Sequence, residues 1–149
     1  ALGTQTAGST IRPASYCGIY GMKPSFGLIP RTGILKTLDT LDHVSFFSRS
    51  VDDLYLMFDI LRVRGENYPF IQKYLDIPLE KGLIKKDNWN VAFVKTPVWE
   101  YAEKYAQEAI LKYVTKLSDI KNILLEEISL PEDFTEAHNT HELIYTKAL

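Results

Sequence analysis

Apolar residues in the second half of the chain follow two different repeats. Residues 91–94 are a short unbroken apolar run, which is typical of a strand buried in an α/β sheet. After Pro97 the repeat changes to the i, i+3/i+4 spacing of an amphipathic helix. The apolar positions of this predicted helix are Tyr101, Ala102, Tyr105, Ala106, Ala109, Ile110, Tyr113, Val114 and Leu117. A second strand over 122–128 and a second helix over 131–148 complete a strand–helix–strand–helix order, which predicts an α/β fold with a crossover helix.

The first half of the chain contains one clear helical repeat. Ser50 with Asp53 three residues later resembles a capping box and predicts a helix that begins at Val51. Asp52 and Asp53 in the first turn also favour the positive end of a helix dipole. The apolar positions that follow at helical spacing are Val51, Leu54, Met57, Phe58 and Leu61.

Proline and glycine divide the rest of the first half into short segments. Pro13 fixes its own φ and disfavours helical backbone at Arg12, so we expect any helix to begin at Pro13. Residues 17–22 are predicted to form a short buried extended segment, and residues 25–38 a loop with a short strand. Residues 62–90 show the weakest pattern, with a short helix predicted over 70–75 and a solvated turn over 85–88.

Composition and charge exclude some classes of protein but do not identify a reaction. The chain has 149 residues, 46% of them hydrophobic and 24% charged, which is ordinary for one globular domain. A formal net charge of −2 argues against a nucleic acid or an anionic membrane as a partner bound through bulk charge. Cys17 is the single cysteine, so an internal disulfide is excluded, and no apolar run reaches the length of a membrane span. We therefore expect a cytoplasmic protein.

Small and hydroxylated residues crowd the segment from Gly3 to Thr10, and Gly8 directly precedes Ser9. Such a run can turn several backbone N–H groups toward one point, where they would stabilise a developing oxyanion, and a serine there can act as a nucleophile. No lysine follows Gly8 as a phosphate-binding P-loop requires, and neither the dinucleotide-binding nor the G-x-S-x-G spacing is present. The spacing alone leaves a catalytic loop and an ordinary surface loop as alternatives.

The segment GTQTAGSTIRPASYCGIYGMKPSFG, residues 3–27, resembles the signature of the amidase signature family. The match runs from Gly3 to Pro24 without gaps and continues more loosely through LDTLDHVSFFSRSVDDL. The resemblance implies an amide-bond hydrolase whose mixed central sheet is flanked by helices. It implies Ser9 as the nucleophile that carries the acyl group, and the backbone N–H groups of Thr6, Ala7, Gly8 and Ser9 as the oxyanion hole.

In this family a lysine acts as the base through a second serine held in a cis peptide, and both lie upstream of the position that matches Ala1. The resemblance therefore implies that the chain is an internal fragment or a truncated gene product, and that these 149 residues alone hydrolyse nothing. It divides the chain into the signature loop with its following helix (1–61), a variable region (62–90) and a scaffold (91–149). It also implies a small-molecule amide substrate, no cofactor and no metal, and it is compatible with a homodimer of the full-length protein.

Two positions bear on the subtype. Arg12 lies three residues after Ser9, and Gln5 stands where other relatives have aspartate, so the segment is more similar to free-standing malonamidase-like amidases. An ammonia-releasing A-type subunit of a tRNA-dependent amidotransferase is the first alternative, which Gln5 disfavours, and an inactive remnant of the fold is the second. Arg12 has two interpretations, a clamp on a buried carboxylate or carbonyl, and a ligand for a substrate carboxylate.

The remaining motif residues and titratable groups are predicted to be structural. Cys17 is expected to be a small buried thiol and Lys23 a surface residue, both within the signature but outside its chemistry. The spacing of Asp39, Asp42 and His43 fits neither a charge relay for Ser9 nor a metal site. His138 and His141 share a face of the last predicted helix, and two histidines alone make a weak metal site.

Overall fold

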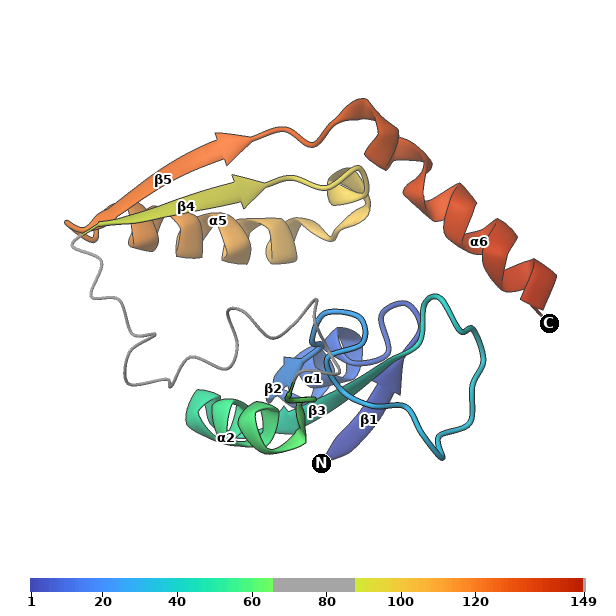
Figure 1. Ribbon diagram of the computed structural model, residues 1–149. Helices are drawn as coiled ribbons and strands as arrows, with labels where there is room; N and C mark the ends of the chain where they lie inside the picture. Colours follow the sequence, from blue (N-terminus) through green and yellow to red (C-terminus); the bar gives the residue numbers. More distant parts are fainter. Residues whose placement is uncertain (66–87, 149) are drawn as a thin grey trace. The chain divides into compact units, whose positions relative to one another are not determined.

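The computed structural model describes residues 1–65 and 88–148. Residues 1–65 belong to one compact unit and residues 88–144 to a second (Figure 1). The helix predicted over 70–75, and the turn predicted over 85–88 apart from Asn88, lie outside the described residues.

A small antiparallel sheet organises the first unit. Its strands are β1 (Leu2–Gln5), β2 (Tyr20–Met22) and β3 (His43–Ser48), in the order β1-β3-β2. Gln5 stands opposite His43 in the register of the first pair, and Tyr20 stands opposite Ser48 in that of the second. The strand β1 ends at Gln5, directly before the glycine-rich turn.

The helix α2 (Val51–Leu61) covers this sheet, and its predicted start is confirmed. The Ser50 hydroxyl oxygen accepts a hydrogen bond from the Asp53 N–H at 3.1 Å, which is a standard N-cap. Leu54, Met57, Phe58 and Leu61 pack against a core formed by Ile29, Val44 and Phe46. Val51, the remaining predicted core position of this helix, is exposed.

The helix α1 (Ile11–Cys17) corrects two predictions. It begins at Ile11 rather than at Pro13, so Arg12 is helical although a proline follows it. Pro13 is the third residue of the helix, where a backbone N–H has no intrahelical partner, so its missing donor costs little. Cys17 ends the helix and is exposed, so the prediction of a buried thiol is wrong. Gly18 follows with φ 62°, the left-handed conformation that closes a helix.

Gly21 lets α1 lie close to β2. A Cβ at this position would stand 2.9 Å from the Ala14 Cβ and 3.3 Å from the Thr10 carbonyl oxygen. Any larger residue would therefore push the start of α1 away from the sheet. Residues 17–22 thus contain a helix end, a left-handed glycine and a short strand rather than one extended segment.

The second unit has the predicted strand–helix–strand order. β4 (Trp89–Val94) pairs in parallel with β5 (Ile123–Ile128), and α5 (Lys104–Ser118) connects them and lies along the pair (Figure 1). Tyr101 precedes α5 in the short 3₁₀ helix η1 (Trp99–Tyr101), and Tyr105 and Tyr113 are exposed on α5. The 3₁₀ helix η2 (Glu132–Glu136) and α6 (Ala137–Ala148) occupy the region predicted as the last helix. The α/β class is confirmed.

In the parts of the chain that the structure describes, no helix is long and apolar enough to cross a membrane.

Candidate active site

The glycine-rich turn connects the end of β1 at Gln5 to the start of α1 at Ile11. Gly8 has no positive φ, so the turn does not depend on the left-handed conformation that glycine allows. A Cβ built on Gly8 would meet no atom within 4 Å in the part of the chain described. Gly8 therefore leaves open space beside the backbone, which is what close approach of a ligand requires.

Buried side chains hold the two ends of this turn together. The Gln5 Oε1 accepts a hydrogen bond from the Thr10 backbone N–H at 2.8 Å. The Thr10 hydroxyl is hydrogen-bonded to the hydroxyl of Ser45 on β3, and both residues are 0% exposed. Gln5 and Thr10 bracket the turn, so these bonds fix the path of the four residues between them.

A second link holds the turn to the segment that precedes β3. The Thr6 hydroxyl donates to Asp42 Oδ1 at 2.7 Å, while Asp42 Oδ2 accepts from the backbone N–H groups of Thr37 at 2.7 Å and Leu38 at 2.9 Å. Burial alone would raise the pKa of Asp42. The Thr6 hydroxyl, the two N–H groups and the positive charge of Arg31 outweigh burial and lower that pKa below the ordinary 3.8.

The catalytic candidate itself is accessible. Ser9 is exposed in the turn immediately before Thr10 and α1, not inside a helix or strand. Its hydroxyl makes no hydrogen bond to any residue within 1–65 or 88–148. A serine hydroxyl in this state is available to a ligand.

The four backbone N–H groups predicted as oxyanion donors also have no hydrogen-bond acceptor among the described residues. Ala7 and Ser9 are exposed, and Thr6 and Gly8 are half-buried. The carbonyl of Gly8, by contrast, accepts from the Arg12 N–H at 3.0 Å, which joins the turn to the first turn of α1.

Arg12 lies in that first helical turn, three residues after Ser9, and is exposed. Its guanidinium makes no ion pair or hydrogen bond to the residues that the structure describes. The described chain thus contains no buried carboxylate or carbonyl that Arg12 clamps.

The other titratable candidates have structural partners. Asp39 pairs with Lys36 at 3.0 Å and with Arg31 at 3.7 Å. The Nδ1 of His43 is hydrogen-bonded to the Leu41 carbonyl at 2.6 Å, and its ring meets Phe26 edge-on. Among the described residues, no group of three or more histidine, cysteine or acidic side chains could hold a metal.

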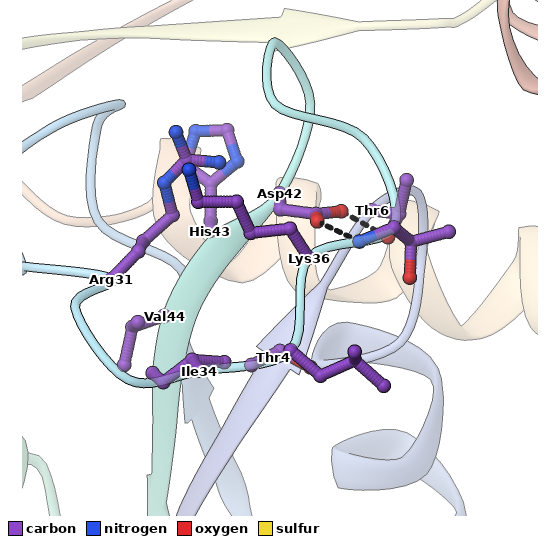
Figure 2. A pocket seen from close by; sticks show the side chains of 10 residues that line it. Thr4, Thr6, Arg31, Ile34, Lys36, Asp42, His43 and Val44 are labelled. Carbon is purple, nitrogen blue, oxygen red and sulfur yellow. Dashed lines mark hydrogen bonds between the residues drawn. The ribbon is translucent and has the colours of Figure 1, made fainter. Parts of the chain in front are cut away.

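A small cavity lies behind the turn, on the side of Asp42. It has about 30 Å³ of space and is lined by residues that include Thr4, Thr6, Arg31, Lys36 and Asp42. Figure 2 shows the Asp42 carboxylate between the Thr6 hydroxyl and the backbone of the loop. This volume suits one or two water molecules and is too small for an amide substrate.

Comparison with known proteins shows the family to which the chain belongs. The Amidase family model matches residues 1–148, so the chain belongs to the amidase family. The resemblance seen in residues 3–27 is thereby confirmed.

Curated relatives and solved structures agree with this assignment. The A-type subunit of a glutamyl-tRNA(Gln) amidotransferase from Campylobacter jejuni (strain RM1221) is 30% identical, in an alignment over 99% of this chain and 28% of the relative. The subunit of the same name from Treponema pallidum (strain Nichols) is 45% identical over 60 residues, 40% of this chain and 12% of the relative. The structure of a 6-aminohexanoate cyclic dimer hydrolase complexed with substrate superposes with a TM-score of 0.71 at 22% identity, over 99% of this chain and 32% of that one. The chain spans less than a third of the length of these proteins.

The sequence pattern alone missed two residues that position the turn. Thr10 and Ser45 were not singled out, although their hydroxyls form the most deeply buried polar contact at the site. For Thr10 the sequence offered only one indication, its position directly after Ser9. Ser45 carried none, because Val44, Ser45 and Phe46 are all buried and β3 shows no alternation of apolar and polar residues.

Proposed function

We propose that this chain supplies the acyl-accepting part of an amide hydrolase, with Ser9 as the nucleophile. The observation that carries the proposal is the exposed, unbonded Ser9 hydroxyl directly after backbone N–H groups that have no partner in the described protein. Attack of the Ser9 oxygen on an amide carbonyl would form a tetrahedral oxyanion. Collapse of that intermediate releases ammonia or an amine, and water then hydrolyses the acyl-enzyme.

The N–H groups of Thr6, Ala7, Gly8 and Ser9 are the proposed oxyanion donors. A donor held in place before the reaction stabilises the developing charge without reorganisation, and loss of one donor typically costs about 3–4 kcal/mol of transition-state stabilisation. The bonds at Gln5, Thr10 and Asp42 support this role, because they fix the turn on both sides of these four residues.

A serine hydroxyl also needs a base. The family resemblance assigns this role to a lysine acting through a second serine, and both match positions outside these 149 residues. Lys23 is not a good candidate, since its ammonium group donates to the Pro24 carbonyl at 2.9 Å. We therefore expect the isolated chain to hydrolyse no amide.

Arg12 is the proposed ligand for a carboxylate on the substrate. Its exposed guanidinium has no partner in the described chain, and Arg12 lies in the first turn of α1, three residues after Ser9. In the full-length protein, Arg12→Leu should raise KM for amides that carry a carboxylate and leave KM for neutral amides unchanged. An equal change for both kinds of substrate would contradict this role.

Turnover of simple amides by the full-length protein tests the nucleophile. Ser9→Ala should abolish hydrolysis, whereas Ser15→Ala, which removes an exposed hydroxyl from the neighbouring helix, should not. Unchanged hydrolysis by the Ser9 variant would refute the assignment.

The second candidate function is that of an ammonia-releasing, A-type amidotransferase subunit. The Campylobacter jejuni relative, aligned over 99% of this chain, favours it. A protein of this kind should prefer glutamine or asparagine as the amide donor and release ammonia faster when its partner subunits are present. Hydrolysis of simple amides by the purified protein alone would favour the free-standing amidase.

We also infer a cytoplasmic location for the full-length protein, because the exposed free thiol of Cys17 suits a reducing compartment.

A further inference from the structure

The register of β1 with β3 continues one step beyond the strands. Each opposed pair, from Leu2 with Phe46 to Gln5 with His43, moves one residue along both strands, so the next pair is Thr6 with Asp42. The Phe47 N–H donates to the Ala1 carbonyl at 2.8 Å, so Ala1 and Phe47 form a hydrogen-bonded pair of the ladder. Because such pairs alternate along an antiparallel ladder, Thr6 and Asp42 fall at a non-hydrogen-bonded position.

Two consequences follow from that position. Opposed side chains come closest at a non-hydrogen-bonded pair, which fits the direct bond of 2.7 Å between the Thr6 hydroxyl and the Asp42 carboxylate. The backbone N–H at such a position also points away from the opposite strand. The hydrogen bond between the two side chains therefore holds Thr6 beside Asp42 at the end of the strand pair. The Thr6 backbone N–H has no partner within the described residues.

The Asp42 carboxylate is itself held in place. Asp42 is 8% exposed, and its second oxygen accepts the N–H groups of Thr37 and Leu38. The carboxylate thus makes a rigid acceptor for Thr6, fixed from a segment more than thirty residues away in sequence. Figure 2 shows the Asp42 carboxylate and its hydrogen bond to the Thr6 hydroxyl.

We propose that Asp42 is a positioning residue, which fixes the first oxyanion donor of the turn by holding the Thr6 side chain. This inference rests on the proposed function, since it gives the link a role in catalysis. Loss of the Thr6 hydroxyl would release one side of the turn at the residue whose N–H is the first donor. Displacement of a catalytic group by about 1 Å can cost on the order of 100-fold in rate.

The test uses variants of Thr6 in the full-length protein. Thr6→Val keeps the branched shape and the backbone N–H but removes the hydroxyl that Asp42 accepts. We expect kcat to fall by about 10- to 100-fold with KM changed by less than about threefold, because the lost interaction acts mainly in the transition state. Thr6→Ser keeps a hydroxyl and should restore most of kcat.

Thr40→Val is the matched control. Thr40 lies in the same segment as Asp42 but is exposed, and its hydroxyl makes no hydrogen bond to the described residues, so kcat should be unchanged. An unchanged kcat in Thr6→Val would overturn the proposal. So would a loss that Thr6→Ser does not relieve and that matches the loss of folded protein in a thermal melt.

Ser9→Ala, assayed in parallel, keeps the two proposals distinct. Turnover that survives Ser9→Ala would refute the proposed function and the inference with it. Turnover lost in Ser9→Ala but unaffected by Thr6→Val would refute the role of Asp42 alone.

Discussion

The hydrogen bond between the Thr10 and Ser45 hydroxyls should make a measurable contribution to stability. Both residues are 0% exposed, so neither hydroxyl can turn to solvent when the other is removed. Thr10→Val preserves the shape of the side chain and leaves the Ser45 hydroxyl without this partner. A buried polar group left unpaired costs about 1–3 kcal/mol, and we expect the free energy of unfolding to fall by that amount.

The double variant separates the bond from the burial of its parts. Ser45→Ala should also cost about 1–3 kcal/mol, because it leaves the Thr10 hydroxyl unpaired. Replacing both residues removes both buried hydroxyls together. The double variant should therefore lose less free energy of unfolding than the two single variants lose in sum. The coupling energy is expected to be about 1–2 kcal/mol, within the range measured for directly contacting residues.

Urea unfolding of the full-length protein, followed by circular dichroism and fluorescence, measures this cycle once the two probes give coincident transitions. Thr40→Val serves as a control, since Thr40 is exposed and should change stability by less than about 0.5 kcal/mol. Strictly additive costs for the two single variants would refute the reasoning that the buried bond fixes the turn.

Three further predictions follow from the same unit. Gly21→Ala should destabilise the fold by about 1–3 kcal/mol, because the new Cβ would stand 2.9 Å from that of Ala14, whereas Gly8→Ala should leave the thermal midpoint nearly unchanged; equal effects in melts of the two variants would contradict the geometry. The lowered pKa of Asp42 implies stability that is fully present above pH 3.8 and lost as pH falls through the lower folded-state pKa, so Asp42→Asn should flatten the acid limb of a stability–pH curve, and an unaltered limb would argue against it. Ser50→Ala should cost about 0.5–2 kcal/mol through loss of its cap on α2, a loss that Ser50→Asp should largely avoid in the same melts.

Sequence patterns predicted the elements whose signals are local. Ser50 with Asp53 marked the start of α2, and the apolar run at 91–94 and the change of period after Pro97 marked β4 and α5. In these elements the capping residue and the apolar repeat lie within one or two turns of each other. Local spacing is therefore enough to place them.

The errors at α1 have both a local cause and a cause in a neighbouring element. Arg12 is helical before a proline because Pro13 falls in the first turn of α1, and Gly21 on β2 gives that helix room. Cys17 is exposed because the helix ends there, a boundary that the pattern did not show. The strands β1 and β3 were missed, since one is short and the other is buried without alternation.

The candidate site likewise has a part that the sequence predicts and a part that it does not. The signature residues from Gly3 to Pro24 predicted the family, which is confirmed, whereas Ser9 as the nucleophile stays a prediction. The residues that hold the turn are paired across the fold, Thr10 with Ser45 and Thr6 with Asp42. No spacing rule connects positions 35 or 36 residues apart, so only the three-dimensional structure brings them together.

Covalent labelling of the full-length protein with a fluorophosphonate probe tests the central claim most directly. The account predicts one adduct, located by peptide mass spectrometry on Ser9 and absent from the Ser9→Ala variant, with labelling unchanged in Ser15→Ala. An adduct on a different serine, or equal labelling of the Ser9→Ala variant, would contradict the account.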